Sequence, residues 1–389
     1  MTPDFKVTGQ EGDLTDNFRD RLISLTVTDN AAEVSDALDI SLSNADRRLI
    51  IPDKGAILTV SLGYTGQLRV MGSYMIDAVI LSGPPDMVRV QGKAAPFTGA
   101  AGQKPIQSRK TRSWSGMTIG EIFKTIAKDN GLQAAIDDEM AQVPIPHIDQ
   151  LAESDMNLLT RLSREYGAVF KPMMGRLVFS KRGTSKSVNG KSLKGITLDR
   201  EDVISYQATI GRRTRKATVS TRYHDNNLGQ TVTLTRSSNV ESVVSGSSVT
   251  PASTTSIDGA GYEDDTTDAG ADYQHPHPYP DAATAAAAAD SMLDQSERGE
   301  HNIEVTLAGH PEFMAEGTLT LTGDFPSAIE KDWIITAVQH TLAKDRGYET
   351  KVISEKKRSK EKATDATADA INLSSTSNVE GIVSGGSTN

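Results

Sequence analysis

Hydrophobic and polar residues alternate along the first quarter of the chain. Ile23, Leu25 and Val27 occupy every second position of one segment. The same spacing recurs in four further segments: 37–44, 56–64, 74–81 and 87–94. Such alternation is typical of strands that turn one face to a core. Because the segments follow one another at short intervals, the pattern predicts a closed or nearly closed antiparallel sheet, a first β-barrel, over residues 1–97.

The pattern changes to a three- and four-residue period after Ser154. Leu159, Leu162 and Tyr166 then fall on one apolar face, which predicts an amphipathic helix. Ser154 can cap this helix because its hydroxyl accepts a hydrogen bond from a free backbone N–H. Gly167 supplies the left-handed residue that commonly ends a helix. Leu159, Leu162, Tyr166 and Gly167 are therefore the residues on which we expect this segment to depend.

A hairpin is expected directly after this helix, where AVFKP and RLVFS flank a tight MMG turn over residues 168–180. A second apolar stripe that begins at Ile119 predicts another helix, ending at Gly131. Composition predicts a loop over residues 94–114. Together these features predict a small α+β insert, a helix-and-hairpin domain, over residues 112–186.

Alternation returns after the insert and predicts a second β-barrel over residues 196–354. Trp333 lies in one of its last strands and is expected to be a core or interface anchor. Two interruptions are predicted within it: a Ser/Thr/Gly/Asp-rich loop excursion over 237–280 and an Ala-rich helix over 281–298. Residues 355–389 read as a mobile or partner-bound tail. The predicted fold class is mainly β with an α+β insert.

The predicted helix over 281–298 has its own boundary residues. Asp281 is placed to cap its first turn, and Gly299 is placed to stop it.

Composition narrows the class of protein. The chain has 389 residues, of which 37% are hydrophobic, enough for more than one core. The absence of cysteine excludes a disulfide framework and a thiolate zinc site. The first residues lack the basic-then-apolar order of a signal peptide, and no apolar run approaches the roughly 20 residues of a bilayer span. We therefore expect a soluble protein that is made in the cytosol.

The net charge of −10 is unevenly distributed along the chain. Residues 257–300 contain eleven acidic residues and one basic residue, which accounts for the whole value. Basic residues gather instead in three acid-free stretches: 87–120, 166–198 and 203–224. They could complement neighbouring subunits or steer a passing polyanion. Solvated loops and edge strands are the simpler interpretation of any single stretch.

Sequence motifs of catalysis are missing. The chain has no GxSxG elbow, HExxH helix, Walker loop or dinucleotide fingerprint. His275 and His277, in HPHP, could share a metal ion, but a Pro-rich extended segment is the commoner source of that spacing. We predict no catalytic residue, no cofactor and no metal site, with His275 and His277 as the remaining metal candidates.

Three stretches, taken in order, resemble the phage tail baseplate hub family, also known as phage late control gene D protein. The first is GMTIGEIFKTIAKDNGL, and the second is QLAESDMNLLTRLSREYGAVFKPMMGRLVFS. The third begins at Ala282 and contains an Ala-rich helix, a G-x-P turn, a W-x-I-x-x-V-x-H strand and a G-Y-x-T hairpin. The same resemblance extends to the N-terminal hub part of VgrG spikes.

The resemblance implies a fold of two tail-tube-like barrels with the insert between them. It also implies a homotrimer, in which two barrels per chain form a pseudo-sixfold ring, an arrangement that closed rotational symmetry makes available. That ring would cap the tail tube protein, carry the trimeric tail spike, and contact the tape measure protein and the baseplate wedge proteins. DNA would cross its lumen only as passing cargo during genome ejection.

The sequence-based hypothesis is therefore a non-enzymatic structural hub in the virion tail baseplate, made and assembled in the host bacterial cytoplasm. One alternative is the hub of a secretion-system spike or of a tail-like bacteriocin. A rival from another class is a peptidoglycan-degrading tail enzyme, although no lysozyme-like or LysM-like stretch is present. The roles of residues 237–280 and 355–389 stay open.

Overall fold

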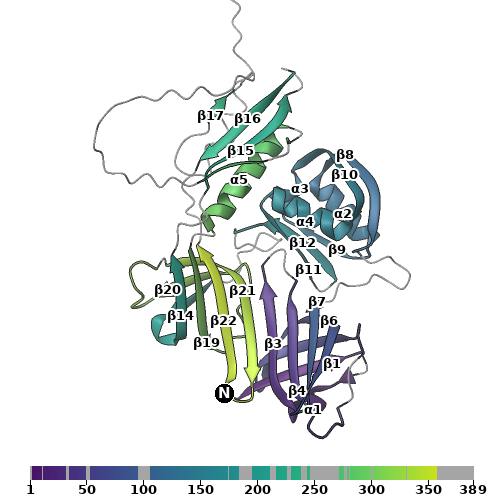
Figure 1. Cartoon of the computed structure of the whole chain (residues 1–389), viewed down its shortest axis with the longest axis vertical. Coiled ribbons are helices and arrows are strands. Elements are labelled where there is room, and N and C mark those ends of the chain that lie inside the picture. Colours follow the sequence, from purple (N-terminus) through teal and green to yellow (C-terminus); the bar gives the residue numbers. More distant parts are fainter. Residues whose placement is uncertain are drawn as a thin grey trace, which may run out of the picture. The chain divides into compact units, whose positions relative to one another are not determined.

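The computed structural model describes most of the chain (Figure 1). The described residues are 2–10, 12–31, 35–49, 53–94, 106–173, 175–183, 195–210, 216–225, 229–237, 243–245, 271–275, 278–279, 281–298, 301–329 and 331–356. All of them belong to one compact unit, Met1–Lys357. Within these residues, no helix combines the length and apolar character of a membrane span.

The largest sheet of the described residues contains 13 strands and draws on both ends of the chain (Figure 1). Its first β set consists of β1 (Pro3–Gly9), β2 (Gly12–Asp13), β3 (Leu22–Asn30), β4 (Ala37–Ser43), β5 (Ile57–Tyr64), β6 (Gln67–Ser82) and β7 (Met87–Ala94), with α1 (Thr15–Arg19) after β2. Its second β set consists of β13 (Ile196–Asp199), β14 (Val203–Ile210), β19 (His301–Ala308), β20 (Thr318–Thr322), β21 (Asp332–Ala343) and β22 (Gly347–Lys356), with a 3-10 turn at Arg200–Asp202.

The two β sets are joined by one ladder, because β21 pairs antiparallel with β3. The strand order through this junction is β14-β19-β22-β21-β3-β4-β7-β6-β5-β1-β2, and β20 pairs with β21 and with β13 off this path. The predicted mainly β fold is confirmed. The ladders of the described residues do not close either set, so the two-barrel arrangement stays a prediction.

Each β set has its own apolar core. Leu25, Ile40 and Val60 are fully buried in the first, as strand alternation predicts. Trp333 and Val338 are fully buried in the second. The alternation predicted for residues 23–29 is wrong at Ile23, which is 37% exposed, while Leu22 is buried. The register of β3 against β4 shifts between Leu22 and Ser24, and this bulge turns Ile23 outward.

The α+β insert contains both predicted helices and the predicted hairpin (Figure 1). Its elements are β8 (Arg109–Thr118), α2 (Ile119–Asp129), β9 (Gln133–Ile136), α3 (Asp138–Ala141), β10 (Pro144–Ser154), α4 (Asp155–Glu165), β11 (Ala168–Met173) and β12 (Arg176–Lys181). The hydroxyl of Ser154 accepts from the N–H of Asn157 at 3.2 Å, as its predicted cap role requires. Gly131 and Gly167 have φ values of 66° and 59° after the two helices.

The predicted loop over residues 94–114 is wrong from Arg109 onward, where β8 begins. This strand pairs with β10, and Trp114 is opposite Ile148. The polar composition of β8 is typical of a loop. Two of its cations nevertheless turn to a buried carboxylate instead of solvent, as described below.

A separate four-stranded sheet follows the insert along the chain. It contains β15 (Lys216–Asp225), β16 (Gln230–Ser237), β17 (Val243–Ser245) and β18 (Ala271–Gln274), in the order β17-β16-β15-β18. Val219 and Leu234 of this sheet pack on Ala289 and Leu293 of α5 (Ala282–Arg298). The strands predicted near 216–224 and 231–236 are therefore present, but they belong to this sheet and not to that of the second β set.

The ends of the excursion and of α5 are partly described. β17 and β18 lie within the predicted excursion 237–280, whose other described residues are Ser237, His275, Pro278 and Tyr279. Asp281 accepts from the N–H of Thr284 at 2.8 Å, as a cap does. The predicted stop at Gly299 and the tail beyond Lys356 lie outside the described residues.

We expect the substitution Leu159→Asp to prevent folding. Leu159 is fully buried, and burying an unpaired carboxylate there should cost more than about 5 kcal/mol, comparable with the stability of a domain. Circular dichroism and solubility measure the outcome. Leu151→Asp is the matched control, because Leu151 is 69% exposed in the same insert and should tolerate the charge within about 0.5 kcal/mol. A folded, soluble Leu159→Asp protein would contradict the assignment of the buried face.

Candidate functional site

The insert is organised around the carboxylate of Asp155, the first residue of α4. This side chain is fully buried. It accepts hydrogen bonds from Lys110 (2.5 Å), Arg112 (2.6 Å), Asn130 (2.9 Å) and Gln150 (2.9 Å). Burial alone would raise the pKa of the carboxyl, but these donors outweigh burial and lower it. The network ties β8, β10 and the end of α2 to the start of α4.

A second ionic cluster, the Lys171 junction, joins three parts of the chain. Lys171 is on β11 of the insert, and its Nζ lies 2.5 Å from Asp29 Oδ1 and 2.7 Å from Asp36 Oδ1. It also donates to the carbonyl of Asn30 at 2.9 Å. The other oxygen of Asp29 accepts at 2.9 Å from the backbone N–H of Ala315, which lies between β19 and β20 of the second β set. One lysine and one aspartate thus connect the insert, the first β set and the second β set.

The Lys171 junction is largely withdrawn from solvent. The side chains of Lys171, Asp29 and Asp36 are 13%, 25% and 15% exposed. Burial alone would lower the pKa of Lys171, but the two carboxylates outweigh it and raise that pKa. Burial raises the pKa of Asp36 in spite of the attraction of Lys171. The ammonium is therefore held charged between the β sets and the insert.

A third cluster lies where the second β set contacts the first. His340 of β21 is 1% exposed, and its Nδ1 is 3.0 Å from the hydroxyl of Tyr348 and 3.3 Å from that of Thr350. Its Nε2 is 3.3 Å from the carbonyl of Phe313. These distances fit a neutral imidazole that donates from Nε2 and accepts at Nδ1. Burial accordingly lowers the pKa of His340 to about 4, although the Phe313 carbonyl acts in the opposite direction.

Tyr348 connects this cluster to the first β set. Its ring centroid lies 5.8 Å from that of Tyr64 of β5, and Tyr64 donates to the carbonyl of Gly309 at 2.7 Å. A Cβ on Gly309 would lie 2.0 Å from the Tyr348 ring, so only glycine fits beside it. Gly309, His340, Tyr348 and Thr350 come from three separate sequence motifs and meet at one place.

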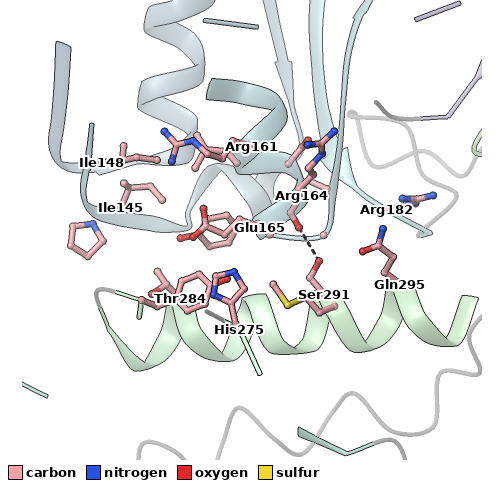
Figure 2. Close-up of a pocket in the computed structure, with 18 of the residues that line it drawn as sticks. Ile145, Ile148, Arg161, Arg164, Glu165, Arg182, His275, Thr284, Ser291 and Gln295 are labelled. Atoms are coloured by element: carbon pink, nitrogen blue, oxygen red, sulfur yellow. Dashed lines mark hydrogen bonds between the residues drawn. The ribbon is translucent and has the colours of Figure 1, made fainter. Parts of the chain in front are cut away.

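One cavity, the α4–α5 groove, lies between the insert and α5 (Figure 2). It encloses about 970 Å³ and is lined by Ile145, Ile148 and Tyr166 from the insert, and by Tyr279, Thr284 and Gln295. The hydroxyl of Ser291 on α5 donates to the carbonyl of Arg164 at 3.1 Å, which fixes the two helices to each other. The lining is mixed apolar and charged, which is typical of a protein interface more than of an enclosed reaction site.

The structure places the predicted structural residues as follows. Leu159 and Leu162 are fully buried in the core of the insert, and Tyr166 is 8% exposed at its edge. Gly167 accepts from the backbone N–H of Arg182 at 3.0 Å, at the rim of the groove. Trp333 is fully buried in the core of the second β set, so of its two predicted roles it has the core one within this chain.

The metal candidates are only partly described. The ring centroid of His275 lies 4.9 Å from that of Tyr279, and the backbone N–H of His275 donates to the carbonyl of Ser220 at 2.8 Å. His277 lies outside the described residues. Over the described ranges, no group of three or more histidine and carboxylate side chains is placed to hold a metal ion.

Comparison with known protein families identifies a match that covers more than half of the chain. The model of the family described as "Phage tail baseplate hub (GPD)" matches residues 106–346. The chain belongs to this family. The match includes the Asp155 network as well as Lys171 and His340, whereas the partners Asp29, Asp36, Tyr348 and Thr350 lie outside the matched residues.

Two curated relatives carry the same description. The chain is 40% identical over 214 residues to a probable baseplate hub protein of Escherichia phage 186, and 38% identical over 214 residues to that of Escherichia phage P2. Each alignment covers 55% of this chain and 54% of the relative. The chain therefore spans about half the length of the curated relatives it matches.

Solved structures share the fold at low sequence identity. The 43 kDa tail protein of prophage MuSo2 from Shewanella oneidensis has a TM-score of 0.63 at 14% identity, over 91% of this chain and 98% of that one. The tail protein from Neisseria meningitidis MC58 has a TM-score of 0.61 at 13% identity, over 92% and 97%. At such identity these likenesses establish the fold alone.

Sequence reasoning missed the polar residues that join the parts of this hub-family chain. His340 and Tyr348 fall at inward positions of predicted strands, and an inward histidine was the one available signal. Nothing local marks Lys171, because its partner Asp29 is 142 positions earlier in the chain.

We expect Lys171→Ala to destabilise the protein by about 3 kcal/mol, because it leaves two poorly solvated carboxylates without their counter-charge. The free energy of unfolding in urea measures this change. Lys181→Ala is the matched control, since Lys181 pairs with Glu139 where both are exposed, and such pairs contribute at most about 1 kcal/mol. Equal effects of the two substitutions would contradict a special role for the Lys171 junction.

We expect the protein to become less stable as the pH is lowered, because of His340. Its pKa is about 4 when folded and 6.5 when unperturbed, so the folded state binds fewer protons between these values. Stability from this group is therefore lost as the pH falls, by about 2 kcal/mol between pH 7 and pH 5. Urea titrations at both pH values measure this loss of stability. In His340→Gln, the loss between pH 7 and pH 5 should be smaller by that amount. An identical pH dependence in both proteins would count against the neutral buried imidazole.

Proposed function

We propose that the protein is the structural hub of a contractile phage-type tail, and that it acts as a homotrimer. Each chain would contribute two tail-tube-like barrels, so that three chains form a pseudo-sixfold ring. The ring would join the sixfold tail tube to the threefold tail spike by mating surfaces, without catalysing a reaction. Membership of the baseplate hub family supports the place in the tail.

The observation that best supports the proposed ring is the antiparallel ladder between β21 and β3. It runs from the pair Ala337↔Asn30 to the pair Ala343↔Ser24 and makes one continuous sheet of the two β sets. Two β sets joined in this way keep a fixed spacing. Three such chains around an axis would present six β sets in a repeating order, as a sixfold partner requires.

The non-enzymatic role is supported by what the buried polar groups do. Asp155, Lys171 and His340 are each bonded to partners within their own chain, and each joins separate strands or helices. The pKa values of Asp155 and Lys171 are altered by these joining contacts, and that of His340 is altered by burial. Structural networks also produce such altered pKa values. In this proposal the partners are the trimeric tail spike, the tail tube protein, the tape measure protein and the baseplate wedge proteins, and DNA is cargo.

Sedimentation equilibrium tests the assembly. We expect a mass of three times 41.7 kDa for the chain, alone or after mixing with its trimeric spike protein. The physical reason is that a ring of six β sets requires three chains, each closing the contact of the next. A monomer mass that persists in the presence of the spike would refute the trimer.

A turnover assay on purified peptidoglycan serves as the control for the rival class. The hub should release no product above background under conditions where lysozyme does. Sustained product release by the pure trimer would replace the structural proposal with an enzymatic one.

A further inference from the structure

The Lys171 junction brings one amine and two carboxyl groups together where solvent has little access. Nζ of Lys171 lies 2.5 Å from Oδ1 of Asp29 and 2.7 Å from Oδ1 of Asp36, and none of the three side chains is more than 25% exposed. An amine and a carboxyl group can condense to an amide. Holding them in contact favours this reaction, because it replaces the encounter that limits the reaction in solution.

The two carboxyl groups have different surroundings, which suit them to different roles. Oδ2 of Asp29 accepts from the backbone N–H of Ala315 at 2.9 Å. An N–H in this position stabilises the negative charge that develops on a carboxyl oxygen when a nucleophile attacks the carbon. Asp36 is the carboxyl group whose pKa burial raises, so it is suited to hold a proton beside the amine. Asp29 is thus placed to react, and Asp36 is placed to transfer protons.

A covalent bond at this junction would link distant parts of the chain. Lys171 is on β11 and Asp29 is on β3, 142 positions earlier. A bond between them would enclose β4 to β7 and most of the insert in one loop, which restricts the unfolded chain as a disulfide does. The chain has no cysteine, so a disulfide cannot supply such a link.

We propose that the side chains of Lys171 and Asp29 condense to an intramolecular isopeptide bond, with Asp36 transferring protons. Each chain would react once, on itself. The ion pair described above would be the starting state, and the amide would then hold the insert to the first β set. This inference does not depend on the trimer or on the role in the tail.

The reaction balances with water as its only by-product. The ammonium of Lys171 first gives a proton to Oδ1 of Asp29 across their 2.5 Å contact. The neutral amine then attacks Cγ of Asp29 to form the N–C bond, and the N–H of Ala315 stabilises the charge on Oδ2. The Cγ–Oδ1 bond breaks as Asp36 protonates the departing hydroxyl, which leaves as water. Asp36 recovers a proton from the attacking nitrogen and so ends as it began.

Mass spectrometry of the purified full chain tests this bond. We expect an intact mass that is lower than the mass of the sequence by one water. A digest should contain one branched peptide, in which Lys171 is joined to Asp29. A folded chain that keeps the full mass of its sequence after long incubation at neutral pH would overturn the proposal. A branched peptide that joins Lys171 to Asp36 instead would overturn the roles given to the two aspartates.

Lys171→Arg is the matched variant for this test. Its guanidinium keeps the positive charge between the two aspartates but stays protonated, so it is not a nucleophile. The variant should fold and should keep its full mass. A loss of water that persists in Lys171→Arg would come from another group and would overturn the proposal. Within the same digest, the exposed ion pair of Lys181 with Glu139 should give no branched peptide.

Asp36→Asn tests the transfer of protons separately from the bond. Asparagine keeps the shape of the side chain but has no acidic proton, so the branched peptide should form more slowly, on the order of a hundredfold. The linked fraction is followed in time after synthesis of the full chain in a cell-free reaction. An unchanged rate in Asp36→Asn would overturn the role of Asp36.

Discussion

The pairing of Lys171 with Asp29 and Asp36 is the interaction on which the arrangement of the chain depends. The hydrophobic effect gives each part its own core, but apolar burial is non-directional and does not by itself orient one core against another. Lys171 supplies direction, because Asp29 accepts from it and also from the backbone of Ala315. The insert and both β sets are thereby fixed at one point, at an ionic contact that would be unfavourable if any partner were missing.

The other two polar clusters repeat this principle at shorter range. Asp155 orients two strands and two helices within the insert, and His340 orients the second β set where Tyr348 meets Tyr64. All three clusters consist of satisfied donors and acceptors that would cost free energy in any other register. If the chain forms the ring proposed above, mating with a tube and a spike would require such defined geometry more than added stability.

The sequence predicted the elements well and their connections poorly. Leu159, Leu162 and Gly167 could be assigned because helix periodicity and capping are local properties. Ile23 was misassigned because a bulge depends on the partner strand, which alternation alone cannot show. The strand β8 was read as a loop because Lys110 and Arg112 look solvated until their acceptor, Asp155, is known. Contacts such as that of Lys171 with Asp29 arise from tertiary structure and leave no periodic trace.

These connections also explain why a helix-and-hairpin unit interrupts two β sets. Its helix α4 buries Leu158 and Leu159 on one face, presents Asp155 to an internal network at its start, and ends at the groove with Glu165. Its hairpin carries Lys171 to the place where the β sets meet. Asp155 and Lys171 thus hold neighbouring parts of the chain in position. In the proposed hub, a unit whose polar side chains are engaged in this way would act as a spacer with a defined shape, and a hub that works by mating surfaces would require that shape of it.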